Sequence, residues 1–412
     1  MFLHFRSEFR MSDLSTIRLK PRKALPFFCR HPWVFEGAIQ SVSGHPVVGA
    51  EVRLESSEGQ FIARGLYNPG SKIRVRLYSW QDRPLDEEFW RTRIEQAVGL
   101  RRQLAGSQAT ATSGERLIFS EGDGISGLTV DRYGHWLLTQ WTSAALAERR
   151  ELLISILQQV VQPRGIWRRT ERGIGDLEGL SAVDGLAVGE EPPRPLEIVE
   201  NDLVYEVDVI EGQKTGFYFD QRDNRLAVAR YAAGARVLDI CTYTGSFAMN
   251  VLKHGNAADV LAVDSSRPAL ELAARNVARN GLADRVTFEA SDAFDKLEAL
   301  AAAGEKFDLV VLDPPKLARS RGGMQRAIKG YIRMNRLGMQ VLRSGGILAT
   351  CSCSGQLSRT DFEQVVVQAA QQAHCEVQIL EQRGQAPDHP VSAHCLETNY
   401  LKCFICRVHH DG

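Results

Sequence analysis

From about residue 200 to its end, the chain alternates between short apolar runs and longer amphipathic segments. Five apolar runs have the length of strands: ARVLDI, ADVLAVD, RVTFEA, FDLVVLD and GGILATC. Between them lie segments with helical spacing, among them PALELAARNVARNG, RTDFEQVVVQAAQQA and a basic segment near 326–343. Because parallel strands need a crossover connection, this alternation predicts an α/β domain with a doubly wound sheet and helices on both faces. YLKCFICRV predicts a final strand.

Four acids stand at the ends of four successive predicted strands: Asp239, Asp264, Asp292 and Asp313. In an open α/β sheet, ligands bind outside the carboxyl ends of the strands. The pattern therefore predicts a cofactor site built from all four acids, Asp239, Asp264, Asp292 and Asp313, together with the turn at Thr244 and Gly245. Each Asp could instead cap the helix that follows it, and this alternative is strongest for Asp264.

The phosphate-binding pattern G-x-G-x-x-G is absent after the first strand, which argues against a nicotinamide dehydrogenase. A single glycine with polar neighbours suits a nucleoside that carries no phosphates. S-adenosylmethionine is such a ligand, and we expect it as the cofactor.

Two further motifs follow strands of the same sheet. One is Asp313-Pro314-Pro315-Lys316, and the other contains Cys351 and Cys353 in TCSCSG. A carboxylate and a thiol facing one crevice favour covalent chemistry on an electrophilic ring or carbonyl. The two thiols share strand parity, but Cys353 lies nearer the carboxyl end, so it is the favoured nucleophile. Cys403 and Cys406 have no second pair, and no metal site is expected.

Composition and patterning divide the chain into three predicted domains. Residues 17–84 are β-rich, residues 85–195 mix strands and helices and end at the Pro-rich EEPPRP, and residues 200–412 form the α/β domain. The eight cysteines and the absence of an export signal favour reduced thiols. No apolar run reaches the ~18 residues of a membrane helix, so no membrane association is expected.

The formal net charge is zero, but basic residues are concentrated in two regions. Between Arg18 and Arg76 ten basic residues face four acids, and eight basic residues and no acid occur from Lys316 to Arg343. Local basic patches attract phosphate whatever the charge of the whole chain. The patches therefore predict contacts with phosphate groups, with solvated surface as the alternative for any single residue. The candidates are Arg18, Lys20, Arg74, Arg76 and Lys316, and Pro314 of the loop before Lys316 is a candidate substrate contact.

Several stretches together resemble the bacterial large-subunit rRNA methyltransferase I family, which forms 5-methylcytidine in 23S rRNA. RHPWVFEGAI and GLYNPGSKIRVRLYS are similar to its N-terminal PUA domain, and EGDGISGLTVDRYG is similar to its central domain. GQKTGFYFDQRDNR, DPPK, SCSG and DHPV…YLK are similar to its catalytic domain. The resemblance implies a class I methyltransferase fold for 200–412, a small α+β central domain and a PUA-like RNA-binding domain at 17–84.

The same resemblance implies roles for individual residues. It places Gln213, Lys214 and Thr215 near the methionine end of S-adenosylmethionine, Asp264 at the ribose and Asp292 near the adenine. Cys353 would be the nucleophile, whereas family members tend to have an apolar residue where this chain has Cys351. It also implies 23S rRNA as partner and a cytoplasmic protein, and it leaves room for a homodimer.

The implied chemistry is addition of the Cys353 thiolate to C6 of cytosine, which activates C5, while Asp313 holds N3. Three alternatives remain open. The same thiol route could act on uridine C5. The Asp-Pro-Pro loop could instead present an exocyclic amine, which needs no thiol. The chain could also be a non-catalytic RNA-binding or ribosome assembly factor.

Overall fold

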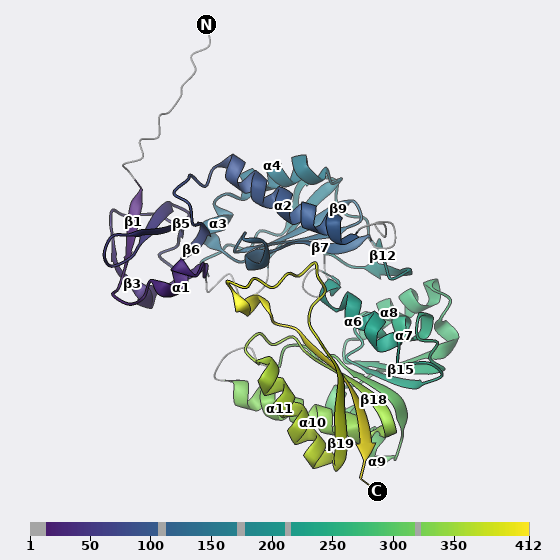
Figure 1. The fold of residues 1–412 in the computed structure, drawn as a ribbon. Helices are drawn as coiled ribbons and strands as arrows, with labels where there is room; N and C mark the ends of the chain where they lie inside the picture. Colours follow the sequence, from purple (N-terminus) through teal and green to yellow (C-terminus); the bar gives the residue numbers. More distant parts are fainter. Residues whose placement is uncertain (1–13, 106–112, 171–177, 211–215, 318–322, 412) are drawn as a thin grey trace.

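The computed structural model describes residues 14–105, 113–170, 178–210, 216–317 and 323–411. Three β-sheet units follow one another along the chain, and the largest sheet belongs to the C-terminal half (Figure 1). Within the described ranges, no helix is both long and apolar enough to cross a membrane.

The N-terminal unit is a six-stranded sheet with the order β2-β6-β5-β4-β1-β3. Its alternating residues Ile17, Leu19, Val52 and Leu54 are fully buried, as the period of two predicts for strands with one face on a core. A one-turn helix, α1 (Leu25–Phe28), packs beside it. The strands are β1 (Ser15–Leu19), β2 (Trp33–Phe35), β3 (Ile39–Val42), β4 (Glu51–Glu55), β5 (Phe61–Tyr67) and β6 (Ile73–Ser79).

The central unit is a five-stranded sheet with the order β11-β10-β9-β8-β7, covered by helices. Two helices at 144–147 and 150–161 are separated at Arg149, whose backbone angles are not helical and whose side chain donates to the Gly49 carbonyl at 2.6 Å. The strands are β7 (Gly114–Phe119), β8 (Leu128–Tyr133), β9 (Trp136–Trp141), β10 (Gly165–Arg169) and β11 (Gly185–Gly189). The helices are α2 (Glu87–Ala105), α3 (Ala144–Ala147) and α4 (Arg150–Val161).

The C-terminal unit is a seven-stranded sheet with the order β16-β15-β14-β17-β18-β20-β19, preceded by the hairpin β12 (Leu196–Glu200) and β13 (Leu203–Val207). Strand β20 runs in the direction opposite to the other six strands, because it pairs antiparallel with both β18 and β19. The doubly wound sheet expected from the sequence is thus confirmed. The strands are β14 (Arg236–Ile240), β15 (Asp259–Asp264), β16 (Val286–Ala290), β17 (Phe307–Leu312), β18 (Leu342–Ser352), β19 (Cys375–Arg383) and β20 (Lys402–His410).

Helices cover both faces of this sheet and form two separate cores. Val228, Phe247 and Val277 belong to one core, and Leu297, Tyr331 and Phe362 belong to the other. The helices of the first face are α6 (Arg222–Ala229), α7 (Ser246–Lys253) and α8 (Arg267–Arg279). Those of the second face are α9 (Ala293–Ala302), α10 (Met324–Gln340) and α11 (Arg359–Ala373).

Two details of this unit differ from the sequence prediction. The basic helix expected near 326–343 ends at Gln340, because Leu342 already pairs with Phe307 in the sheet. Strand β19 was not foreseen, since CEVQILEQR is mostly polar and lies at the partly exposed edge of the sheet. Polar edge strands lack the apolar run that identifies a buried strand.

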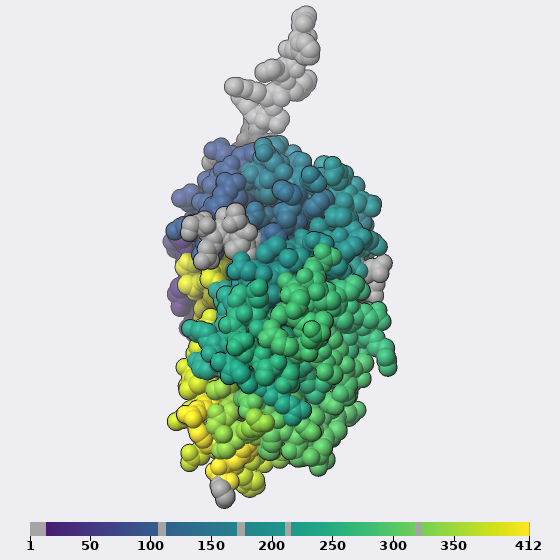
Figure 2. Space-filling view, turned by 90° about the vertical axis from the view of Figure 1, so that its right-hand side faces the viewer, coloured from purple at the N-terminus to yellow at the C-terminus, as the bar shows by residue number. Residues whose placement is uncertain are grey.

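The segment before β20 reaches back to the N-terminal unit, and in both views this yellow segment lies beside purple residues (Figures 1 and 2). His394 Nδ1 lies 3.0 Å from the Cys29 carbonyl oxygen, and His31 Nε2 lies 3.5 Å from Glu397 Oε1. The C-terminal unit therefore contacts the N-terminal sheet directly, although the two are far apart in the sequence.

Arg76 of the N-terminal unit is buried at the contact with the central unit and bonds to residues of that unit. Its side chain is buried, and its guanidinium donates to Glu121 at 3.2 Å, to Ser126 at 3.0 Å and to Glu178 at 3.2 Å. A guanidinium held in this way would have to break these bonds to reach a phosphate, and breaking a buried ion pair is costly. The expectation that Arg76 contacts RNA is therefore withdrawn.

Candidate active site

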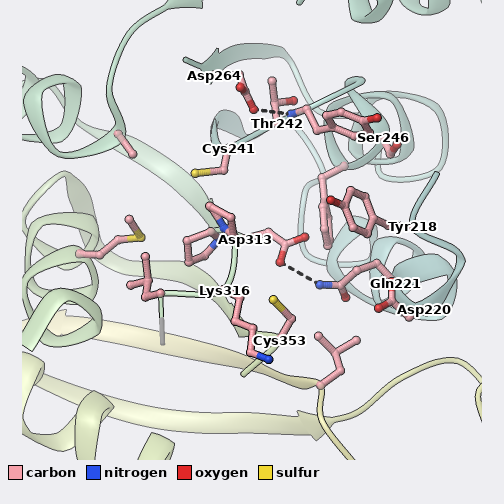
Figure 3. A pocket seen from close by; sticks show the side chains of 18 of the residues that line it. Tyr218, Asp220, Gln221, Cys241, Thr242, Ser246, Asp264, Asp313, Lys316 and Cys353 are labelled. Atoms are coloured by element: carbon pink, nitrogen blue, oxygen red, sulfur yellow. Dashed lines mark hydrogen bonds between the residues drawn. The ribbon is translucent and has the colours of Figure 1, made fainter. Parts of the chain in front are cut away.

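A cavity of about 620 Å³ opens at the carboxyl edge of the seven-stranded sheet (Figure 3). Residues that follow β14, β15, β16, β17 and β18 line it, and the start of the antiparallel β20 reaches the same edge. Its lining includes most of the chemistry-bearing residues predicted from the sequence: Asp264, Asp292, Asp313, Pro314, Pro315, Lys316 and Cys353.

The two thiols of TCSCSG have different surroundings. Cys353 lies one residue beyond the end of β18 and faces the cavity. Cys351 is fully buried within the strand, opposite Cys403 of β20. The hydrogen bond with Cys403 and burial raise the pKa of the Cys351 thiol well above its ordinary value. Of these two thiols, only Cys353 can reach a ligand in the cavity, in agreement with its choice as the nucleophile.

Asp313 is held by an amide that the sequence analysis did not identify. Gln221 Nε2 donates to Asp313 Oδ1 at 3.0 Å, as the dashed line in Figure 3 marks. Asn224 Nδ2 donates to Gln221 Oε1 at 2.6 Å, and Arg383 Nε donates to Asn224 Oδ1 at 3.0 Å. This chain of bonds fixes which end of the Gln221 amide faces Asp313. From the sequence, FDQRDN is only part of the stretch that resembles the catalytic domain of the family, with no role for Gln221 itself.

Asp264 and Asp292 both line the cavity but are held differently. Asp264 accepts the backbone N–H groups of Tyr243 and Ser266, each at 2.9 Å, while Ser266 caps α8. The alternative role of Asp264 as the cap of that helix is thus taken by Ser266. Asp292 is itself the cap of α9 and accepts the Phe294 N–H at 2.8 Å. Asp292 therefore caps a helix and lines the cavity at the same time.

Three predicted cofactor residues lie behind the cavity wall instead of on it: Asp239, Thr244 and Gly245. Asp239 accepts the Thr242 hydroxyl at 2.6 Å and the Ala248 N–H at 3.2 Å, and burial raises its pKa to about 7. Gly245 has a positive φ of 80° at the start of α7, where a side chain would be strained. These residues shape the loop whose Cys241, Thr242 and Tyr243 reach the cavity. Gln213, Lys214 and Thr215 lie outside the described residues.

Tyr218 and Tyr400 also line the cavity, and the buried Lys402 lies behind this part of its wall. The Tyr400 hydroxyl donates to Asp220, and Tyr218 has its pKa raised by burial and by the charges of Asp220, Asp313 and Cys353. Lys402 is buried, and its Nζ donates to the carbonyls of Ser354 at 2.6 Å and Tyr400 at 2.8 Å. Burial lowers the pKa of Lys402 to about 8, while the charge of Cys353 opposes this shift. Lys402 thus anchors the SCSG loop, which carries Cys353, to the start of β20.

The basic residues still predicted to contact phosphate form ion pairs or hydrogen bonds within the N-terminal unit, except for Lys316 at the cavity. Arg18 lies 3.1 Å from Glu55, Arg74 lies 2.6 Å from Glu36, and Lys20 donates to the Gly37 carbonyl at 3.0 Å. Lys316 is exposed and lines the cavity. Surface ion pairs of this kind are weak, so Arg18 can exchange its partner for a phosphate at little cost.

The lining fits an adenosine ligand. The Asp264 carboxylate keeps lone pairs beyond the two N–H groups it accepts, and ribose hydroxyls are donors that suit them. Phe294 offers an apolar surface beside Asp292, and a cavity of about 620 Å³ has the size of an ordinary small-molecule site. Asp264, Asp292 and Phe294 would therefore hold the nucleoside of S-adenosylmethionine.

Comparisons with known proteins agree with this architecture. Residues 17–80 match the model of a PUA-like domain, and residues 180–398 match that of an S-adenosylmethionine-dependent methyltransferase. Proteins called ribosomal RNA large subunit methyltransferase I, from Erwinia tasmaniensis and Yersinia pestis, are 41% identical over 381 residues, or 92% of this chain and 96% of theirs.

Among solved structures, a putative methyltransferase complexed with SAH has a TM-score of 0.83 at 20% identity, with coverage of 95% of this chain and 99% of that one. A putative SAM-dependent methyltransferase from Streptococcus mutans has a TM-score of 0.82 at the same identity and coverage. At this identity the likeness concerns the fold alone. The sequence identity, the matched domains and the strand-end cavity together show that the chain belongs to the ribosomal RNA large subunit methyltransferase I family of S-adenosylmethionine-dependent enzymes.

Proposed function

We propose that the protein transfers a methyl group from S-adenosylmethionine to C5 of a cytidine in 23S rRNA, with Cys353 as the covalent nucleophile. The observation that carries the proposal is that Cys353 and Asp313 face one cavity at the carboxyl edge of the sheet (Figure 3). The substrate class follows from relatives whose names specify large-subunit ribosomal RNA.

C5 of cytosine is a weak nucleophile, and addition of a thiolate to the neighbouring C6 makes it reactive. The Cys353 sulfur forms a bond to C6, and the electrons of the C5–C6 double bond make C5 nucleophilic. C5 gains the methyl group, a base removes the C5 proton, and the electrons left behind restore the double bond and expel the thiolate. Lys402, whose Nζ donates to the carbonyl of Ser354 next to Cys353, would supply a positive charge that stabilises this thiolate.

Asp313 is proposed to hold the base and to stabilise the charge that develops on it. A protonated carboxyl can donate to N3 of cytosine, which is an acceptor, while the Gln221 amide fixes the other end of the group. Uridine carries a proton at N3, so the same donor would oppose it. Pro314 and Pro315 limit the freedom of the loop and so keep Asp313 in position.

S-adenosylmethionine supplies an electrophilic methyl group when bound. Asp264 would accept its ribose hydroxyls, Asp292 would lie near the adenine, and Gln213, Lys214 and Thr215 are proposed at its methionine end. Lys316 at the rim of the cavity, together with Arg18, Lys20 and Arg74 of the N-terminal unit, is proposed to contact RNA phosphates. We place this activity in the cytoplasm, where rRNA is available.

Replacing Asp264 with alanine is expected to weaken S-adenosylmethionine binding by roughly 1–3 kcal/mol, because the ribose hydroxyls lose a charged, half-buried acceptor. Titration calorimetry with the full-length protein measures this directly. Asp295→Asn is a matched control, since Asp295 is exposed on α9 and lies outside the cavity lining. Undiminished affinity in Asp264→Ala would remove Asp264 from the cofactor site.

Mass spectrometry of 23S rRNA nucleosides tests the reaction itself. A strain that lacks the protein should lose one 5-methylcytidine, and the wild-type gene should restore it. Loss of a 5-methyluridine or of an amine-methylated base would identify a different product and overturn the cytosine assignment. An unchanged nucleoside profile would favour a non-catalytic role.

A further inference from the structure

A second, smaller cavity of about 220 Å³ lies where the N-terminal and central units meet. Three arginines from different segments converge on it: Arg30 follows α1, Arg83 lies between β6 and α2, and Arg93 lies within α2. Trp80 and Phe89 provide its aromatic surface, and no Asp or Glu is part of its lining. A small cavity lined by cations and without acids has the chemistry of an anion site.

The guanidinium groups of Arg83 and Arg93 both pack against the ring of Phe89. Their central carbons lie 5.3 Å and 5.4 Å from the centroid of the Phe89 ring, which is buried. Arg93 Nη2 also donates to the Tyr78 carbonyl at 3.2 Å. The ring and this hydrogen bond hold both planar groups in place, so an anion would meet oriented donors instead of freely moving side chains.

Like charges are brought together here at an electrostatic cost. Burial lowers the pKa of Arg93, and the charges of Arg83 and Arg30 lower it further. Other arginines of the N-terminal unit have carboxylate partners: Arg53 lies 2.5 Å from Asp82, and Arg64 lies 2.9 Å from Glu51. Among the described residues, none of Arg30, Arg83 and Arg93 forms an ion pair with a carboxylate. A bound anion would offset their repulsion.

Contacts between the N-terminal unit and the segment before β20 link the arginine pocket to the candidate active site. Arg30 immediately precedes His31, whose Nε2 lies 3.5 Å from Glu397 Oε1, and Glu397 lines the large cavity. Cys29, on the other side of Arg30, contacts His394 of the same C-terminal segment through its carbonyl oxygen. A strand of RNA with one nucleotide in the large cavity therefore has the arginine pocket within reach of its flanking backbone.

We propose that the arginine pocket binds a backbone phosphate of the RNA substrate, next to the nucleotide that enters the active site. The Arg30, Arg83 and Arg93 groups supply the hydrogen bonds and charge, and the half-buried Trp80 ring offers a stacking surface for an adjacent base. This inference rests on the proposed RNA substrate and assigns a fixed point of contact for it.

The double substitution Arg30→Gln with Arg83→Gln tests the pocket while leaving Arg93 and its bond to Tyr78 in place. Binding of a fragment of 23S rRNA should become roughly tenfold weaker, since charge-assisted hydrogen bonds are lost. The slope of log affinity against log salt should decrease by about 0.7, the value for one phosphate on a single strand. Arg102→Gln with Arg91→Gln is the matched control, because both residues lie on α2 outside the pocket.

Thermal unfolding and S-adenosylmethionine affinity, measured on the same samples, should equal those of the wild type. If the double variant unfolds at a lower temperature than the wild type, Arg83→Lys provides the second test. This change keeps the charge but loses the planar fork, and it should weaken RNA binding without changing the salt slope.

RNA affinity and salt slope equal to those of the wild type would overturn the phosphate contact of the arginine pocket alone. Calorimetric binding of inorganic phosphate that is lost in the variant, with RNA binding unchanged, would show a free-anion site and overturn the RNA assignment. Absence of RNA binding in the wild type would instead count against the proposed function.

Discussion

Replacing Cys353 with alanine is expected to abolish methyl transfer while leaving S-adenosylmethionine affinity unchanged. The reason is that C5 of cytosine becomes nucleophilic only when the thiolate adds to C6, and no other thiol of this loop reaches the cavity. Single-turnover transfer of a labelled methyl group to an rRNA fragment measures the loss. Calorimetry on the same variant measures the cofactor affinity.

RNA that contains 5-fluorocytidine makes the covalent step visible. Fluorine at C5 cannot leave as a proton does, so the Cys353 adduct should accumulate as a band of higher mass on a denaturing gel. Cys351→Ala is the matched control, because Cys351 is buried against Cys403 and should cost packing without loss of the adduct. An active Cys353→Ala with an inactive Cys351→Ala would reverse the assignment of the thiols. Activity in the double variant would exclude a covalent route through either thiol of this loop and favour methylation of an exocyclic amine.

Replacing Asp313 with asparagine is expected to lower the rate of methyl transfer by about 10²–10⁴-fold at saturating cofactor, the range for loss of a positioned acid or base. The amide keeps the shape and the partner Gln221, but it cannot carry the proton that the base needs at N3. Single-turnover rates at several pH values measure this loss. Asp295→Asn, a change of the same type on the exposed surface of α9, should keep the full rate.

Gln221→Glu separates a catalytic role of Asp313 from a structural one. A second carboxylate at hydrogen-bonding distance favours the protonated form of the pair, because two like charges at close range cannot both ionise easily. If transfer requires a protonated Asp313, the rate falls as pH rises through the titration of this pair, and the variant should move that fall to higher pH. A uniform loss at every pH, without such a movement, would assign Gln221 and Asp313 a structural role only.

The sequence by itself determined the architecture of the C-terminal unit and most of its reactive residues. Runs such as FDLVVL are apolar throughout because strands in a parallel sheet are buried on both faces. The carboxyl ends of such strands meet at one edge, so Asp264, Asp292, Asp313 and Cys353 could be assigned to one cavity without coordinates. The choice between Cys351 and Cys353 also followed from their distance to the end of the strand.

Only the tertiary structure decided which side chains meet across long stretches of chain. Asp239 stands at a strand end like the others, yet its carboxylate turns toward Thr242 and the start of α7, behind the cavity wall. Gln221 meets Asp313 across 92 positions, and Arg76 turned out to be a buried link between units. Periodicity tells which face of an element is buried, but not which element packs against it. For the same reason, the convergence of Arg30, Arg83 and Arg93 became visible only once the N-terminal sheet was placed against α2.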